Sequence, residues 1–173
     1  MEKTVGSYPK DCRFKSCLRD QILIEVTNME KYTSEKEVID LVRSFENATI
    51  SREDWKHREH LIVALYYVSH HDLETATRKM RSGILNLLTN GFKVDLTKEM
   101  PYHETMTLFW MRTVAAFNVS KNGDSMVSKI GEMTSLFDKD YPLKFYTREL
   151  LFSDRARAEF VDSDLKVIDT VYQ

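Results

Sequence analysis

The chain has 173 residues and a net charge of −2, with 42% hydrophobic and 30% charged residues. This composition is typical of one globular domain with a real core and argues against extensive disorder. Because the basic residues are not in excess, nucleic acid is not expected as the main partner. No apolar stretch reaches the roughly 18 residues of a membrane-spanning helix, so no membrane span is expected.

The N-terminal segment, residues 1–33, is the part whose structure the sequence predicts least. Its apolar residues around Ile22–Val26 fit a short helix or a strand equally well. Cys12 and Cys17 are too few for a disulfide framework, and their spacing is not that of a zinc site. No apolar run near the start resembles a signal peptide, so we expect a cytoplasmic protein with free thiols.

From residue 34 onward the sequence predicts helices. Only five glycines and three prolines are present, which favours long helices over many tight turns. Ser34 with Glu37 three residues later forms a capping box, Ser51 opens the second helix, and Asp72 caps the third. The expected helices cover residues 35–46, 51–70, 72–88, 103–118, 125–137, 148–151 and 154–161. We therefore predict an all-α, single-domain bundle of about six helices over residues 34–173.

Histidines interrupt the apolar faces of two of these helices. At about 100° per residue, His57 falls in the apolar arc of the second helix, and His60 lies at the edge of that arc. In the fourth helix, His103 begins an apolar stripe that continues through Trp110, and Thr107 shares its face. The same helical wheel puts Thr105 and Arg112 on the opposite face, so both are expected to point away from the stripe.

Imidazole is a costly core residue, since both ring nitrogens need partners, and it is also the commonest metal ligand and a general acid–base. His57, His60 and His103 are therefore candidate ligands of a divalent metal, Zn²⁺ or Fe²⁺, with one coordination position left open. Two alternatives remain: a ligand or catalytic pocket without metal, and three histidines that simply satisfy buried hydrogen bonds.

Other polar residues complete the hypothesis. Glu104 is a candidate general base or a first-turn acid that favours the helix dipole. Arg81 flanks the apolar stripe of the third helix and needs an acceptor, which Glu104, Asp54 or an anionic ligand could supply. Tyr102, Thr107, Trp55 and Arg81 are candidate ligand-binding residues.

The motifs Trp55-Lys-His57-Arg-Glu-His60-Leu61, Arg81-Ser-Gly-Ile84 and Tyr102-His103-Glu104-Thr105-Met-Thr107 resemble those of a family of small, uncharacterised bacterial all-helical proteins. The likeness covers about residues 45–166 and includes the segment 145–165. It departs at Lys56 and Ser163, where the family has threonine and proline. The resemblance implies one coherent domain and motif set, but no reaction.

These observations predict a histidine-rich pocket between helices, in a metal-dependent enzyme acting on a small anionic molecule. The alternative is a non-catalytic ligand-binding or protein-interaction module. The sequence predicts no oligomeric state.

Overall fold

The computed structural model of the chain describes residues 31–167. The chain separates into two units, Met1–Thr33 and Ser34–Gln173, and the second unit contains all the helices described. The expectations for Cys12, Cys17 and Ile22–Val26 lie outside the described residues. Within the described range the chain forms seven α-helices and no strand, which confirms the all-α prediction. No helix in this range is long and apolar enough to cross a lipid bilayer.

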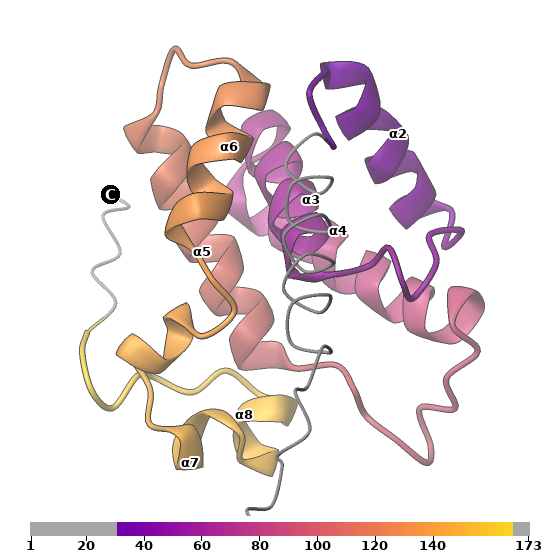
Figure 1. Cartoon of the computed structure of the whole chain (residues 1–173). Coiled ribbons are helices and arrows are strands. Elements are labelled where there is room, and N and C mark those ends of the chain that lie inside the picture. Colours follow the sequence, from indigo (N-terminus) through magenta and orange to yellow (C-terminus); the bar gives the residue numbers. More distant parts are fainter. Residues whose placement is uncertain (1–30, 168–173) are drawn as a thin grey trace, which may run out of the picture. The chain divides into compact units, whose positions relative to one another are not determined.

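The elements follow one another along the chain as labelled in Figure 1. The helices are α2 (Glu35–Glu46), α3 (His57–His70), α4 (Leu73–Asn86), α5 (Glu104–Ser120), α6 (Met126–Leu136), α7 (Arg148–Leu151) and α8 (Asp154–Ala158). A π-helical turn, Leu87–Gly91, continues α4, and a 3₁₀ turn, Tyr141–Lys144, precedes α7. The seven helices of the described range agree with the expected bundle of about six, and the two short C-terminal helices, α7 and α8, fall in the last two expected ranges.

Helix α3 is the centre of the bundle and contacts α2, α4, α5 and α6. Its buried residues surround the helix instead of forming one stripe. They are Glu59, Leu61, Ile62, Val63, Ala64, Leu65 and Tyr67. A helix that is apolar on nearly every side needs neighbours on every side, and this requirement places α3 in the middle of the fold.

The predicted start of the second helix at Ser51 is wrong. Ser51 is instead the first residue of a single turn that is separate from the helix. In this turn its hydroxyl accepts a hydrogen bond from the Asp54 backbone N–H at 3.1 Å. Lys56 is extended, with φ −110° and ψ 179°, and helix α3 begins at His57. The carboxylate of Glu59 accepts a bond from the Lys56 N–H at 3.2 Å, which supplies the cap at this end.

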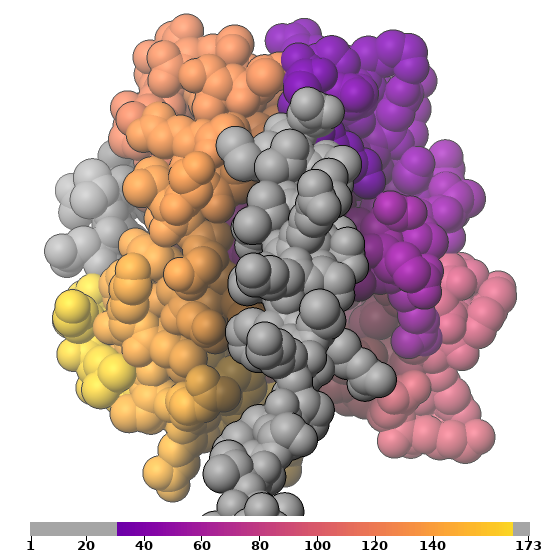
Figure 2. All heavy atoms as spheres, viewed as in Figure 1, coloured from indigo at the N-terminus to yellow at the C-terminus, as the bar shows by residue number. Residues whose placement is uncertain are grey.

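The C-terminal segment packs against the beginning of α5 and forms a second core with it. Its buried members are Phe109, Tyr146, Leu151, Ala156 and Val161. Figure 1 shows α7 and α8 beside the first turns of α5, and in Figure 2 the segment after α6 forms a continuous surface with α6.

The predicted helix 154–161 is shorter in the structure, since α8 ends at Ala158 and Glu159 is extended. The reason lies in α5. Thr105, which is fully buried, donates its hydroxyl hydrogen to the Glu159 carbonyl at 2.9 Å and accepts from the Val161 N–H at 3.1 Å. These two bonds hold residues 159–161 in an extended conformation. Thr105, which the helical wheel placed opposite the apolar stripe of α5, is therefore buried against the segment that follows α8.

Candidate functional site

A cavity of about 320 Å³ lies between α3, α4 and α5. Its lining residues are His57, His60, Ala64, Met80, Ile84, Pro101, Tyr102, His103, Met106, Thr107, Trp110 and Met111. All three predicted histidines, together with Tyr102 and Thr107, line this one hollow. Among the described residues, no Lys, Arg, Asp or Glu lines the cavity. Its wall is therefore mostly apolar, with a few uncharged polar groups.

His103 uses both of its ring nitrogens to hold the fold together. It is the N-cap residue of α5, and its Nδ1 accepts a hydrogen bond from the Met106 backbone N–H at 3.3 Å. Its Nε2 lies 2.8 Å from the Leu151 carbonyl oxygen. A carbonyl can only accept, so Nε2 carries the proton, and neither nitrogen retains a free lone pair.

His57 and His60 each use one nitrogen. His57 Nε2 donates to the Phe137 carbonyl at 3.0 Å, and His60 Nδ1 donates to the Lys56 carbonyl at 2.8 Å. These bonds assign the tautomers and leave Nδ1 of His57 and Nε2 of His60 as acceptors. Neither of these two atoms has a hydrogen-bond partner within residues 31–167. Both residues line the cavity, so its wall contains two imidazoles that each keep an unused lone pair.

Aromatic contacts fix both rings. The His57 ring lies 4.8 Å from that of Trp110, and the His60 ring lies 4.0 Å from that of Trp55. Trp55 also stacks on Phe45, at 4.8 Å. Trp55 is not one of the residues that line the cavity in the described part of the chain. It contacts the His60 ring and does not contact the hollow directly.

The three imidazoles are neutral at pH 7. Burial lowers the pKa of His60 to about 4. Burial also lowers the pKa of His57, partly opposed by its bond to Phe137, and lowers that of His103, with a further contribution from nearby Arg157. Desolvation disfavours the charged form in each case, so the cavity wall carries acceptor nitrogens without positive charge.

The expectation of a Zn²⁺ or Fe²⁺ ion held by His57, His60 and His103 gains no support. In the described part of the chain, no three His, Cys, Asp or Glu side chains are arranged so that they could hold one metal ion. The hydrogen bonds give a physical reason, because a coordinating imidazole needs a free lone pair and His103 has none.

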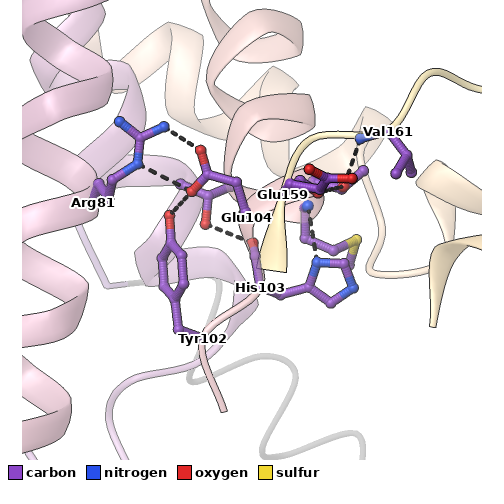
Figure 3. Close-up of polar contacts among 9 residues, drawn as sticks. Arg81, Tyr102, His103, Glu104, Glu159 and Val161 are labelled. Carbon is purple, nitrogen blue, oxygen red and sulfur yellow. Dashed lines mark hydrogen bonds and ion pairs between the residues drawn. The ribbon is translucent and has the colours of Figure 1, made fainter. Parts of the chain in front are cut away.

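Arg81, Tyr102 and Glu104 form a polar cluster beside the cavity (Figure 3). Arg81 donates to both carboxylate oxygens of Glu104, with Nε 3.0 Å from Oε2, and the Tyr102 hydroxyl donates to Oε2 as well. Burial opposes ionisation of Glu104, but the bonds from Arg81 and Tyr102 outweigh it and lower its pKa. A carboxylate stabilised in this way is a weak base, which disfavours the catalytic role predicted for Glu104.

The acceptor that Arg81 needs is Glu104, the first of the three partners expected for it. Figure 3 shows Arg81 and Tyr102 both directed at that carboxylate while His103 points away. Arg81 does not line the histidine cavity in the described structure. It lines a separate cleft between α4 and α5, together with Arg78 and Arg112.

Several lining residues carry no signal in the sequence, among them Met80, Met106, Met111 and Pro101. Methionines spread along a sequence are usually core residues, and nothing in their spacing marks a cavity. Of these, only Met80 belongs to a feature that could have indicated it, the i, i+4 apolar stripe of α4 that also contains Ile84.

Comparison with known proteins adds no relative. No protein-family model matches the sequence, and no curated protein or solved structure is significantly similar to it.

Proposed function

We propose that this protein binds a small, uncharged, mostly apolar molecule that donates a hydrogen bond to the histidine pair. The observation that carries the proposal is a cavity of about 320 Å³ whose wall contains two neutral imidazoles with unused lone pairs. Ligand cavities of about 300–1,000 Å³ with a few placed polar groups are typical of small-molecule sites.

The electrostatics favour an uncharged ligand over the anionic one expected from the sequence. No cation among the described residues lines the cavity, and the guanidinium of Arg81 is engaged by Glu104 outside it. An anion buried there would lose its hydration without gaining a counter-charge. A neutral N–H or O–H donor would instead replace water at His57 Nδ1 or His60 Nε2.

The aromatic and sulfur-bearing wall favours a flat ring. Trp110 and Tyr102 present ring surface, and the thioethers of Met80, Met106 and Met111 adapt to different outlines. We therefore choose indole as the probe. Indene is its matched partner because a CH₂ replaces the N–H, and indole-3-carboxylate adds the negative charge.

Calorimetric titration tests the proposal. Indole should bind about three- to tenfold tighter than indene, as expected for one net hydrogen bond, and indole-3-carboxylate should bind weakest. Ile84→Phe, which fills the cavity, should weaken all three. Absence of saturable binding by both indole and indene would reject the proposal.

His60→Phe keeps a ring but removes the acceptor, so it should retain indene binding and lose the preference for indole. His70→Phe is the matched control. His70 also donates Nδ1 to the carbonyl four residues earlier, at 2.7 Å from Tyr66 O, and stacks on an aromatic ring, but it lies outside this cavity. An indole preference unchanged by His60→Phe would contradict the assigned role of His60.

A second candidate function is metal-free acid–base catalysis in the same cavity. It is favoured by His57, whose neutral ring is held in one tautomer with Nδ1 available as a base. The test uses 5-nitrobenzisoxazole, an uncharged bicycle. A base removes its ring C–H proton while the N–O bond breaks, yielding a coloured cyanophenolate. His57→Phe should abolish acceleration above buffer, whereas no acceleration by the unmodified protein would reject this candidate.

A cytoplasmic location, in which Cys12 and Cys17 would stay as free thiols, is part of this proposal. Fractionation of cells that express the untagged chain tests it.

A further inference from the structure

Most polar side chains of the histidine cavity donate their protons to the protein itself. The Tyr102 hydroxyl donates to Glu104, and the Thr107 hydroxyl donates to the His103 carbonyl at 3.0 Å. The three lining histidines donate their ring N–H groups to backbone carbonyls. None of these five side chains therefore keeps an N–H or O–H for a ligand.

Trp110 differs from the other polar residues that line the cavity. Its indole Nε1–H can only donate, and it has no acceptor within residues 31–167. The nitrogen is also not one of the fully enclosed, unpaired polar atoms of this range, so it reaches open space. A tryptophan N–H in a packed site normally finds a partner. The Trp110 N–H is therefore a donor whose acceptor a ligand can supply.

Ring contacts on several sides hold the Trp110 indole beside His57. The centroids of these two rings are 4.8 Å apart, with 58° between the planes. The same indole contacts Phe109, Phe137 and Tyr141, at 5.2, 6.2 and 6.1 Å. A ring packed in this way has little freedom to turn. The unused donor of Trp110 and the unused lone pair of His57 thus belong to neighbouring rings of one cavity.

A donor and an acceptor on neighbouring rings favour a ligand that carries both complementary groups on one edge. A cyclic amide has this edge, because its ring holds the N–H and the C=O on the same side. An open-chain amide prefers the trans form, in which the two groups point in opposite directions. A cyclic amide is also uncharged, which suits a cavity that no charged side chain of the described range lines.

We propose that the cavity recognises a small cyclic amide, whose N–H donates to the histidine pair and whose carbonyl accepts from the Trp110 N–H. This inference rests on the small-molecule function proposed above and narrows its ligand class. It makes Trp110 a specificity-determining residue, whereas helical periodicity alone marks it only as part of an apolar stripe.

Four bicyclic probes separate the two hydrogen bonds. Indene has neither polar group, indole has the N–H, 2-indanone has the C=O, and oxindole has both. In calorimetric titrations, oxindole should bind about three- to tenfold tighter than indole, as expected for one further net hydrogen bond. 2-Indanone should exceed indene by a similar factor, so oxindole should bind tightest of the four.

Trp110→Phe keeps an aromatic ring and removes the N–H. It should reduce the ratio of oxindole affinity to indole affinity to about one, and a general loss of packing cancels in this ratio. Trp55→Phe is the matched control. Trp55 is the second of the two tryptophans and contacts the His60 ring, but it does not line the cavity, so the ratio should not change.

NMR spectroscopy provides a measurement that does not depend on the Trp110 variant. Each of the two tryptophans gives one side-chain Nε1–H signal, and Trp55→Phe assigns the remaining signal to Trp110. This signal should lie further downfield with oxindole bound than with indole bound, because a carbonyl acceptor deshields the proton.

The outcomes distinguish this inference from the function on which it rests. Equal affinities of oxindole and indole, a ratio unaffected by Trp110→Phe, or the same Trp110 signal with both ligands would overturn the inference and leave the proposed function intact. Absence of saturable binding by indole and indene alike would reject both.

Discussion

Arg81 on α4 and Glu104 at the first residue of α5 are joined by two hydrogen bonds between the guanidinium and the carboxylate. The Glu104 side chain is only 14% exposed and that of Arg81 39%, so the pair is neither fully buried nor freely solvated. Tyr102 donates to the same carboxylate. The cluster thus ties α4 to the beginning of α5, between the histidine cavity and the arginine-lined cleft.

Replacing Glu104 with Gln should lower the free energy of unfolding by about 1–2 kcal/mol, because Arg81 keeps its charge while losing its counter-charge. Urea denaturation measures this loss. Asp40→Asn is the control, because its pair with Lys36 lies within one helix with side chains 48% and 83% exposed, and it should change stability by less than about 0.5 kcal/mol. Equal effects of the two substitutions would contradict the structural role assigned to Glu104.

Stability should fall as the pH drops from about 6.5 toward 4. Burial lowers the pKa of His60 from 6.5 to about 4 in the folded state, so the unfolded chain takes up the proton first and gains stability relative to the folded one. His60 alone should remove about 2 kcal/mol between pH 7.5 and 5. Urea titrations at a series of pH values measure the slope, which should be shallower in His60→Phe.

Two glycines should respond to alanine in opposite directions. A Cβ at Gly83 would lie 2.3 Å from Cε1 of Phe45, whose ring is fully buried and stacked on Trp55. Gly83→Ala should therefore destabilise the fold by about 1–3 kcal/mol. Gly131 in α6 has nothing within 4 Å of an added Cβ, so Gly131→Ala should stabilise it by about 0.5–1 kcal/mol. Thermal unfolding of both variants distinguishes these signs.

Thr105→Val preserves shape and removes the hydroxyl that bridges the Glu159 carbonyl and the Val161 N–H. Both backbone groups would be stranded, at a cost of about 1–3 kcal/mol. Hydrogen exchange should accelerate at the Val161 amide. In Thr134→Val, which removes only bonds to the Ile130 and Gly131 carbonyls of the same helix, exchange at Val161 should not change.

Added Zn²⁺ or Fe²⁺ should not raise the melting temperature of the untagged protein, because both His103 nitrogens are already hydrogen-bonded. A metal that binds the native state selectively would raise it. Thermal scans with and without metal, together with elemental analysis, measure this. Stoichiometric metal that is lost in His103→Ala would restore the three-histidine hypothesis.

The sequence predicted the start of a helix correctly where the capping residues lie close together in the chain. Ser34 and Glu37 form the expected capping box, and Asp72 caps α4 by accepting from the Thr75 N–H at 2.8 Å. Such caps use atoms within three residues of one another, so no distant contact is needed to form them. Periodicity likewise predicted that His57, His60 and His103 turn inward, and they line one cavity.

What periodicity leaves undecided depends on partners far apart in the chain. The Ser51 hydroxyl could cap a helix. Only the surrounding fold decides that it instead begins a separate turn before α3. The acceptors of His57 and His103 are carbonyls 80 and 48 residues away, so which nitrogen remains free is a property of the packed molecule. The same holds for Arg81, because only the antiparallel contact of α4 with α5 decides between a carboxylate and a ligand as its partner. Side-chain type and spacing determine the inward face of a helix. Whether a polar group is hydrogen-bonded or free depends instead on which atoms tertiary packing places within about 3 Å of it.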